Sequence, residues 1–481
     1  MALTETNPTT NGSTSGLAGV LAAQRRAFEA HGAPSAEERK ADLTTLLRLV
    51  LDNRKAIARA CQEDFGARST HESEIAEVIA SAHAIRYARR HVAKWMKPRR
   101  RATGIWFWPA PNRIVPQPKG VVGIMVPWNF PVNLAVAPLA SALAAGNRAM
   151  IKTSELTPAT GDLLQNLVAE RFAPEHVTVI GGDVDVARAF AALPFDHLLF
   201  TGSTAVGRQI MKAAAENLTP VTLELGGKSP AIVDQGYPLE RAAERIVWGK
   251  LLNSGQICIA PDYVLVPEGR QKEFADLAGA AARRLYPKLA GNPDYTSVVN
   301  DAHYQRLCGW VDEARDKGAH VETALEPDDS RAERKLPLTV VLDPTDDMKV
   351  ATEEIFGPVL PIVGYETLDE AVEYVNRRPR PLALYLFSHR AASREKVVEE
   401  TTSGGVTLDD TLLHYLQDDM PFGGVGPSGM GSYHGQEGFD TFSHRKPVFR
   451  QLGLGSQTGA KLLYPPYGKV TGLLLQLMRK I

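Results

Sequence analysis

The spacing of apolar residues changes along the chain, and each change predicts a different kind of structure. From residue 17 to residue 97, apolar side chains recur at helical intervals, which predicts a series of amphipathic helices. Ser35-x-x-Glu38 and Ser69-x-x-Glu72 each have the form of a reciprocal capping box, so each is predicted to open a long helix. We interpret this region as packing helices, with Cys61 as a structural residue inside one of them.

Between residues 121 and 233, short apolar runs alternate with helical segments. This alternation is typical of crossover units on a parallel sheet. The predicted strands are residues 121–126, 148–153, 177–180, 197–200, 221–225 and 231–233. Thr157-Pro158 and Gly202-Ser203-Thr204 have the form of helix starts. Because ligands bind at the carboxyl ends of such strands, the loops that follow them are the places to look for chemistry.

After residue 260 the pattern predicts a second α/β lobe. Its expected helices are residues 269–288 and 302–317, and its expected strands are residues 263–266, 338–341 and 382–386. Residues 106–119 predict a hairpin excursion, and the basic run at residues 97–101 is interpreted as a solvated helix end and linker. The chain is therefore predicted to be an α/β protein with two lobes.

Length and composition narrow the classes of function. With 481 residues the chain is too long for one hydrophobic core, which agrees with two lobes. Its 54 basic and 55 acidic side chains nearly cancel, so neither nucleic acid nor an anionic membrane is an expected partner. Three widely spaced cysteines indicate free thiols in a reducing compartment. No secretory signal, no apolar run of about 18 residues and no metal-binding signature is present, so we expect a cytoplasmic protein without a metal.

Two residues are candidates for covalent chemistry. Cys258 ends the hexapeptide Asn253-Ser254-Gly255-Gln256-Ile257-Cys258, where a helix is expected to give way to a turn. A thiol exposed at a turn can attack a substrate, although most cysteines are buried in cores. Glu224 continues a strand with apolar neighbours, and a buried carboxylate with a raised pKa suits a general base. The alternative for Glu224 is a structural ion pair with Lys228, and both readings remain open here.

Two loops are candidates for binding a nucleotide. Lys152-Thr153-Ser154-Glu155 follows the second predicted strand, where a carboxylate can accept both hydroxyls of an adenosine ribose. Thr201-Gly202-Ser203-Thr204-Ala205-Val206-Gly207 follows the fourth, where helix-start amides favour a phosphate. The same features also occur as a surface charge pair and as an ordinary capped turn. Glu353-Glu354-Ile355-Phe356-Gly357-Pro358 reads on its own as a turn.

Together these motifs resemble the aldehyde dehydrogenase superfamily, in the family's order and over residues 17–450. The motifs are Pro127-Trp128-Asn129-Phe130-Pro131, Lys152-Thr153-Ser154-Glu155, Phe200-Thr201-Gly202-Ser203, Leu223-Glu224-Leu225-Gly226-Gly227-Lys228-Ser229-Pro230, Gly255-Gln256-Ile257-Cys258 and Glu354-Ile355-Phe356-Gly357-Pro358. The tail is similar to the class 3 branch, which includes coniferyl and fatty aldehyde dehydrogenases. It reads Pro421-Phe422-Gly423-Gly424-Val425-Gly426, Ser428-Gly429-Met430-Gly431 and Phe439-Asp440-Thr441-Phe442-Ser443-His444.

The resemblance implies two Rossmann-like parallel-sheet lobes with a small bridging and oligomerisation β element. The implied parts are a flexible arm at residues 1–16, an NAD-binding domain at 17–226 with a bridging hairpin at 98–120, a catalytic domain at 227–415, a return to the bridging element at 416–450, and a C-terminal extension at 451–481.

The resemblance also implies a mechanism. Cys258 attacks the aldehyde carbon, the Asn129 amide and the Cys258 backbone N–H hold the alkoxide, and Glu224 activates water to hydrolyse a thioester. The implied cofactor is NAD, with NADP possible, because Glu155 should repel a 2′-phosphate. Its implied contacts are Lys152, Ser154 and Glu155 toward the adenosine ribose, Gly202, Ser203 and Gly207 toward the pyrophosphate, and Glu354 and Phe356 toward the nicotinamide ribose and ring.

Partners and substrate complete the prediction. A homodimer is expected, in which a helix in residues 461–481 packs on the protein or on a partner subunit, with peripheral membrane contact as the less favoured reading. The segment Pro465-Pro466-Tyr467-Gly468-Lys469 is similar to the corresponding segment of coniferyl aldehyde dehydrogenases. An aromatic aldehyde such as coniferaldehyde is therefore the first expected substrate, and a medium-chain or long-chain aliphatic aldehyde the second. Candidates to line the substrate tunnel are Trp128, Phe130, Trp248, Ile257, Ile259, His414 and Tyr415. An acyl-transferring relative is disfavoured by Glu224, and a non-catalytic structural or binding protein on the same fold is the alternative from another class.

Overall fold

The structure, a computed structural model, describes residues 14–104, 107–108, 110–325, 329–451 and 464–479. The predicted arm at residues 1–16 therefore lies largely outside the described residues. The helices of the N-terminal layer are α1 (Thr14–His31), α2 (Ala36–Asp52), α3 (Arg54–Phe65), α4 (Thr70–Ser73), the π-helical turn η1 (Glu74–Ile79) and α5 (Ala80–Trp95). The helical prediction for this region is confirmed, and Cys61 is buried in α3.

The two predicted capping boxes have different outcomes. Ser35 and Glu38 form the full reciprocal box at the start of α2. At Ser69 only half of the box forms: the Ser69 hydroxyl accepts from the Glu72 N–H, but the Glu72 carboxylate accepts from Thr296 Oγ1 at 2.8 Å and from the Asn253 N–H. Glu72 is therefore a contact between the helical layer and the second lobe, and this part of the prediction was wrong.

The first lobe is a six-stranded sheet in the order β15-β7-β6-β3-β4-β5. Five strands are parallel and confirm the predicted positions: β3 (Val121–Met125), β4 (Arg148–Lys152), β5 (Val177–Ile180), β6 (His197–Thr201) and β7 (Val221–Glu224). The antiparallel edge strand is β15 (Gly429–Met430). Its helices are α6 (Asn133–Ala145), α7 (Pro158–Ala169), α8 (Val184–Ala191) and α9 (Thr204–Ala215). Every residue of α6 is buried, because this helix packs against α2 and α5 as well as against the sheet.

Helix α7 begins differently from the prediction. Pro158 takes the first helical position as expected, but Thr157 makes no side-chain cap. Asp64 of α3 supplies the cap instead, since its carboxylate accepts from the Ala159 and Thr160 N–H groups at 2.9 Å each. A carboxylate satisfies these free amides better than a hydroxyl because it also complements the helix dipole.

The second lobe is a seven-stranded sheet in the order β10-β11-β12-β9-β8-β13-β14. Its strands are β8 (Ser229–Val233), β9 (Pro261–Pro267), β10 (His320–Thr323), β11 (Thr339–Leu342), β12 (Val359–Tyr365), β13 (Ala383–Phe387) and β14 (Gly405–Leu408). Its helices are α10 (Leu239–Leu251), α11 (Gln271–Leu285), α12 (Asp301–Asp316), α13 (Lys349–Thr352), α14 (Leu368–Asn376) and α15 (Ala391–Glu400). The strand predicted at residues 231–233 belongs to this sheet, so the chain crosses between lobes directly after β7. The α/β fold with two parallel-sheet lobes is confirmed.

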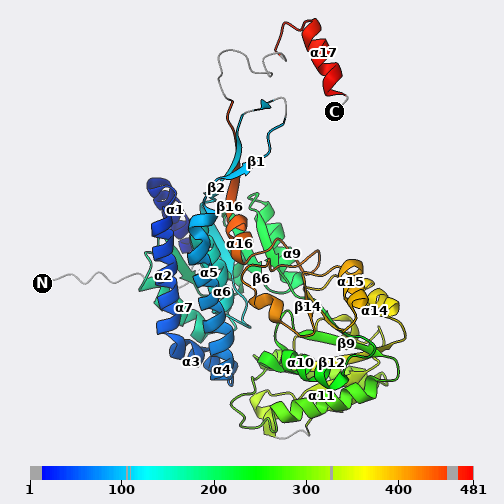
Figure 1. The fold of residues 1–481 in the computed structure, drawn as a ribbon. Coiled ribbons are helices and arrows are strands. Elements are labelled where there is room, and N and C mark those ends of the chain that lie inside the picture. The colour runs from blue at the N-terminus through cyan, green and yellow to red at the C-terminus, as the bar shows by residue number, and fades with distance from the viewer. Residues whose placement is uncertain (1–13, 105–106, 109, 326–328, 452–463, 480–481) are drawn as a thin grey trace, which may run out of the picture.

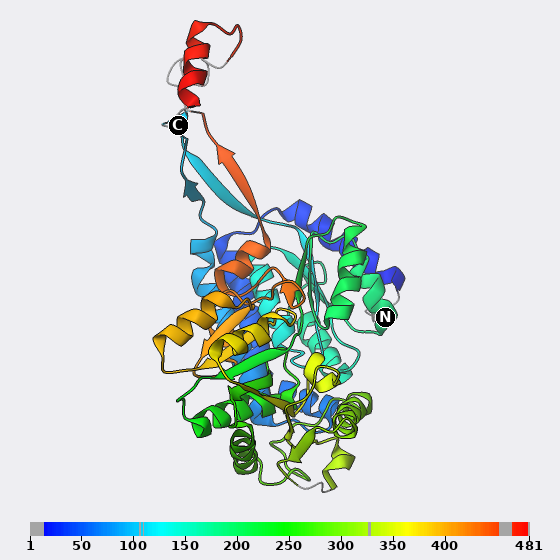
Figure 2. The same cartoon turned by 90° about the vertical axis from the view of Figure 1, so that its right-hand side faces the viewer.

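A three-stranded antiparallel sheet leaves the body of the molecule. It consists of β1 (Arg99–Arg101), β2 (Asn112–Pro118) and β16 (Ser443–Phe449), which follows α16 (Gly435–Thr441). The prediction of a solvated helix end and linker at residues 97–101 holds for Lys97, which is exposed between α5 and β1. It is wrong for residues 99–101, which form β1, and Arg99 binds Asp440 with two hydrogen bonds of 2.8 and 2.6 Å. Figures 1 and 2 show this sheet as a stalk, with α17 (Lys469–Met478) beyond its tip. Within the described ranges, no helix is long and apolar enough to cross a membrane.

Candidate active site

The candidate residues gather where one sheet ends and the other begins. Asn129 follows β3 and Glu224 is the last residue of β7, so both lie at the carboxyl end of the first sheet. Cys258 precedes β9 and Glu354 precedes β12, which places them at the amino end of the second sheet. Because β7 leads into β8 through a short loop, these two sheet ends face each other, and the loops between them form the site.

Cys258 is carried by a rigid turn after α10. Asn253 and Ser254 adopt left-handed backbone conformations, with φ of 49° and 54°. The Asn253 side-chain amide donates to the backbone carbonyl of Asn129 at 3.3 Å. Gln256 is fully buried, and its side chain donates to the Ser297 carbonyl at 3.1 Å and accepts from the Val299 N–H at 2.9 Å. The turn is therefore fixed on both sides and brings Cys258 beside the Asn129 loop.

The Cys258 thiol lies near two acidic side chains. The residue is only partly exposed, and its pKa is raised to about 12 by burial and then by the charges of Glu354 and Glu224. The backbone N–H groups of Cys258 and Ile259 oppose this rise. In the protein alone the thiol is therefore protonated at neutral pH, and a nearby base must take its proton before it can attack.

Asn129 is poised as a hydrogen-bond donor. It is buried, and its side-chain amide donates one hydrogen to the Gln256 carbonyl at 3.1 Å. An amide has two hydrogens, so a second one is left for an oxyanion formed next to Cys258. Its own backbone carbonyl accepts from Arg68 at 3.1 Å and from the Asn253 side chain.

Arg68 and Glu77 support this loop and were missed from the sequence. Their charged groups lie 3.2 Å apart and are both fully buried. The Glu77 carboxylate also accepts from the N–H groups of Val132 at 3.1 Å and Asn133 at 2.7 Å, where α6 begins. The available signal was positional: Glu77 falls four residues from Ser73 and from Ser81, so it lies on their buried helix face.

Glu224 is a buried carboxylate without a polar partner. Neither of its oxygens has a hydrogen-bond partner within the described part of the chain, and burial raises its pKa well above the ordinary value. The alternative of an ion pair with Lys228 is wrong, because the Lys228 amine lies 2.7 Å from Asp262 instead. A carboxylate held in this way binds a proton readily, as a general base must.

The first candidate nucleotide loop has one buried and one exposed charge. Lys152 is buried and donates to the carbonyls of Thr153 at 2.6 Å and Gly182 at 2.8 Å, which leaves one of its three hydrogens. Glu155 is exposed, and Ser154 accepts from the Leu156 N–H at 3.2 Å. The group that the sequence assigned to a ribose is thus open to solvent and to a ligand.

The second candidate loop opens α9. Ser203 is its N-cap and accepts from the Val206 N–H, which confirms the predicted helix start. The glycines here have a packing role: a Cβ atom on Gly202 would lie 2.5 Å from the Phe200 ring, and one on Gly207 would lie 2.6 Å from Leu225. A side chain at either position would push the neighbouring Phe200 or Leu225 side chain away, so the glycines have a packing role whether or not a phosphate binds.

Glu354 and Phe356 lie beside the catalytic candidates. Glu354 Oε1 has no hydrogen-bond partner among the described residues, and its pKa is raised to about 8 by burial and then by the charge of Asp262. Phe356 has a left-handed backbone, with φ of 50°, and its ring meets Trp128 edge-on at 5.3 Å. An unpartnered buried carboxylate oxygen and an open helix start fit the hydroxyls and phosphates of a dinucleotide. No group of three or more potential metal ligands occurs within the described residues.

Aromatic residues surround the thiol, and sequence reasoning found only some of them. The pKa values of Tyr415 and Tyr433 are raised by burial and also by the charges of Cys258 and Glu224, which places both tyrosines near the thiol. Tyr415 packs edge-on against Phe422 at 4.9 Å, and His414 stacks on the same ring at 6.0 Å. Of the other predicted tunnel residues, Ile257 and Ile259 are buried, Trp128 and Phe130 are partly exposed, and Trp248 is 39% exposed on α10. Tyr433 and Phe422 were not predicted as tunnel residues, because they lie in or beside a glycine-rich segment that shows no regular spacing of apolar residues.

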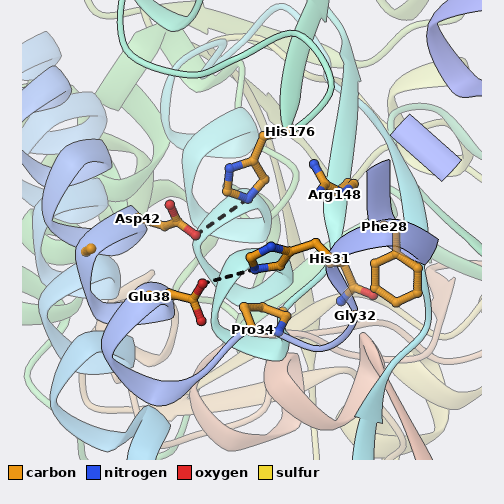
Figure 3. A pocket seen from close by; sticks show the side chains of 11 residues that line it. Phe28, His31, Gly32, Pro34, Glu38, Asp42, Arg148 and His176 are labelled. Atoms are coloured by element: carbon orange, nitrogen blue, oxygen red, sulfur yellow. Dashed lines mark ion pairs between the residues drawn. The ribbon is translucent and has the colours of Figure 1, made fainter. Parts of the chain in front are cut away.

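A separate hollow of about 290 Å³ lies between α1, α2 and the start of β4. Figure 3 shows His31 paired with Glu38 and His176 paired with Asp42 at its wall. None of the candidate site residues lines it. It is therefore distinct from the candidate active site.

Comparisons with known proteins agree with this geometry. The profile described as "Aldehyde dehydrogenase family" matches residues 9–448. The chain is 54% identical over 453 residues to "Probable coniferyl aldehyde dehydrogenase" of Pseudomonas aeruginosa, which covers 94% of each chain. A solved structure titled "Substrate bound state of Staphylococcus Aureus AldH" matches with a TM-score of 0.89 and 35% identity, over 96% of this chain and 99% of that one. An NAD-dependent aldehyde dehydrogenase from Sinorhizobium meliloti matches with a TM-score of 0.83 and 28% identity, over 92% and 88% of the two chains.

Proposed function

The chain belongs to the aldehyde dehydrogenase family and is an oxidoreductase that acts on aldehydes with a nicotinamide cofactor; we propose that it uses NAD to oxidise an aromatic aldehyde such as coniferaldehyde to the carboxylic acid. The observation that carries this proposal is the position of Cys258, which is partly exposed and close enough to the unpartnered carboxylate of Glu224 for that charge to raise the pKa of the thiol. The name of the Pseudomonas aeruginosa relative supports the aromatic substrate.

Catalysis begins with proton removal from the Cys258 thiol. A carboxylate with a raised pKa, such as that of Glu224, takes this proton more readily than an ordinary one. The thiolate then attacks the aldehyde carbon, and the carbonyl oxygen becomes an alkoxide bound to the same carbon. The free hydrogen of the Asn129 amide and the Cys258 backbone N–H are the donors that hold this oxygen, and loss of one such donor costs about a hundredfold to a thousandfold in rate.

The cofactor would be held by the loops around this centre. Glu155, Lys152 and Ser154 form the adenosine side, Ser203 with Gly202 and Gly207 the phosphate side, and Glu354 with Phe356 the nicotinamide side. A nicotinamide bound there would supply the acceptor for the hydride of the alkoxide carbon.

Hydrolysis completes the cycle on this chain's own residues. Once the hydride has left, the substrate is a thioester on Cys258. Glu224 first releases to solvent the proton that it took from the thiol. It then takes a proton from water, the resulting hydroxide attacks the thioester carbon, and the acid leaves as Glu224 returns this second proton to the sulfur. The absence of a polar partner on Glu224 keeps both of its oxygens available for water.

We also propose that the protein is a cytoplasmic homodimer. The described cysteines are all free, and α17 exposes an apolar face in the single chain: Val470, Leu473 and Leu477, spaced by three and four residues, are 59%, 66% and 53% exposed. Exposed apolar surface of this kind is typical of an interface. Removing residues 464–481 should reduce the dimer fraction in light scattering without creating or removing vesicle binding; loss of vesicle binding instead would favour membrane contact.

The chemistry is tested by measuring acid formation from coniferaldehyde with NAD. Cys258→Ser should abolish it, whereas Cys308→Ser, which changes a thiol in the second lobe, should leave it intact. Glu224→Gln should form the first NADH per site more slowly, because the thiol loses its base, and should then stall, because the thioester accumulates. Full activity of Cys258→Ser would refute the mechanism. A panel of coniferaldehyde, benzaldehyde and decanal tests the substrate: a preference for decanal of about tenfold, equivalent to ~1.4 kcal/mol, would favour the aliphatic alternative.

A further inference from the structure

Asp262 lies at the start of β9, four residues after Cys258, and only 3% of it is exposed. Its carboxylate contacts three separate segments. Oδ2 accepts from the Lys228 amine at 2.7 Å, Oδ1 lies 3.5 Å from the Lys250 amine, and both oxygens lie 3.2 Å from the Ile355 backbone nitrogen. One buried group therefore meets the loop after β7, the end of α10 and the segment before β12.

Each of these contacts lies next to a residue of the proposed reaction. Lys228 ends the loop that begins at Glu224, and its amine also donates to the carbonyls of Val350 at 3.0 Å and Glu353 at 2.8 Å. Ile355 directly follows Glu354. The bonds of Lys228 and Asp262 thus hold the backbone on both sides of Glu354 and attach it to the Glu224 loop.

The third contact reaches the Cys258 turn. Lys250 is fully buried in the last turn of α10, from which that turn leaves. The two segments also meet through backbone: a Cβ atom on Gly255 would lie 2.5 Å from the Gly357 carbonyl oxygen. Burial and then the Asp262 charge act in opposite directions on Lys250, and its pKa is lowered to about 8. Two buried lysines share one aspartate, an arrangement that is costly to maintain for stability alone.

We propose that Asp262 is a positioning residue for aldehyde oxidation, because its carboxylate fixes the relative places of Glu224, Cys258 and Glu354. The inference rests on the proposed function, which assigns the roles of those three residues. Asp262 touches none of the reacting atoms; it acts through Lys228, Lys250 and the Ile355 amide.

The test compares Asp262→Asn with Asp234→Asn. Asp234 is a matched control, since it is also a buried aspartate that accepts from a basic side chain, Arg390, and from Ser388. Both variants should lower Tm. Asp262→Asn should also lower kcat by about tenfold or more with little change in KM for the aldehyde, because a displacement of about 1 Å in the reacting groups can cost about a hundredfold. Asp234→Asn should keep kcat within about twofold.

A double variant distinguishes the effect of Asp262 on the positions of the reacting groups from its effect on stability. Lys250→Met in the Asp262→Asn background removes one buried charge of each sign, so Tm should recover. The remaining amide offers a single acceptor oxygen to Lys228 and Ile355, so kcat should stay low. Recovery of kcat together with Tm, or wild-type kcat in Asp262→Asn, would overturn the proposal.

Alkylation of Cys258 by iodoacetamide, located by peptide mass spectrometry, gives a readout that needs no aldehyde oxidation. Asp262→Asn should change the alkylation rate by about threefold or more, a shift of about half a pKa unit or its equivalent in access, and Asp234→Asn should not. If the wild-type protein oxidises no aldehyde, the proposed function fails, while this comparison still decides whether Asp262 positions the thiol. Equal alkylation rates in all three proteins would count against the positioning role.

Discussion

Gly226 lies directly against the carboxylate of Glu354, so that a Cβ atom on Gly226 would stand 2.0 Å from Oε2 and 2.3 Å from Oε1. Because the carboxylate ends a flexible side chain, Gly226→Ala should displace it and leave the fold intact. We expect kcat/KM for NAD to fall by about tenfold to a hundredfold, since a misplacement of about 1 Å has effects of this size. Steady-state kinetics with NAD varied, together with Tm, measure this.

Gly309→Ala is the control for that substitution. A Cβ atom on Gly309, in α12, would meet nothing within 4 Å, and its backbone is helical. It should leave kinetics unchanged and stabilise the helix by up to about 1 kcal/mol. Unchanged use of NAD in Gly226→Ala would mean that Glu354 does not contact the cofactor from its present position.

Without cofactor, the Cys258 thiol should ionise only at high pH, and it should ionise at lower pH when its acidic neighbours are replaced by neutral residues. Its pKa of about 12 arises from burial first, then from Glu354 and then from Glu224. A negative charge disfavours the thiolate, so removing one lowers the pKa. In Glu354→Gln, and less strongly in Glu224→Gln, the rate of alkylation by iodoacetamide at pH 8 should rise; below the pKa it increases about tenfold for each unit by which the pKa falls.

Glu155→Gln serves as the control, because Glu155 is exposed at the nucleotide loop and does not contribute to the pKa of Cys258. It should leave alkylation unchanged. In the wild type the rate should continue to climb with pH beyond 9. A plateau near pH 8 would show instead that the thiolate is already stabilised without cofactor.

Much of this architecture could be predicted from the order of residues. The strands of the first lobe are continuous apolar runs because both faces of a parallel sheet are covered, and β3 and β6 are buried at every position. Cys258, Glu224 and Asn129 could be proposed because each lies in a short motif that resembles the aldehyde dehydrogenase family, directly beside a strand or helix end. Such motifs are local, so a single sequence displays them.

The supporting contacts could not be predicted because they join distant segments. Arg68 meets Asn129 across 61 positions, and Lys228 meets Asp262 across 34. The alternative of an ion pair between Glu224 and Lys228 failed for a related reason. The chain leaves the first sheet at Glu224 and enters the second at Ser229, so Lys228 turns toward the second lobe, where Asp262 and the Glu353 carbonyl receive it. Nearness in sequence gave no information about this change of sheet.

Preference for NAD over NADP should depend on Glu155. Its exposed carboxylate follows β4, where the proposed adenosine ribose lies, and a 2′-phosphate there would meet a like charge. Glu155→Gln should raise kcat/KM for NADP by about tenfold, equivalent to ~1.4 kcal/mol, without improving that for NAD. Steady-state kinetics with NAD and with NADP at fixed ionic strength measure the ratio of the two kcat/KM values.

Glu175→Gln is the matched control, since Glu175 is an exposed carboxylate before β5, at the opposite end of the same sheet. Its cofactor preference should equal that of the wild type. An unchanged NAD to NADP ratio in Glu155→Gln would place the ribose elsewhere.

The Arg68–Glu77 pair should stabilise the first lobe and the Asn129 loop together. Its charged groups are fully buried and 3.2 Å apart, and Glu77 also binds the first amides of α6. Glu77→Gln leaves the guanidinium of Arg68 buried without its counter-charge, which typically costs about 3–5 kcal/mol. Because Arg68 donates to the Asn129 carbonyl, kcat should fall as well. Urea unfolding followed by activity and by tryptophan fluorescence measures both effects.

Two further variants show whether the loss comes from the unpaired charge. Asp185→Asn breaks the pair between Asp185 and Arg188, whose side chains are 77% and 76% exposed, and should change stability little, since such exposed pairs contribute about 0–1 kcal/mol. Arg68→Met with Glu77→Gln removes both buried charges and should recover much of the stability lost in Glu77→Gln, but not kcat, because the Asn129 carbonyl loses its donor. If Glu77→Gln were no less stable than Asp185→Asn, the pair would not hold the loop.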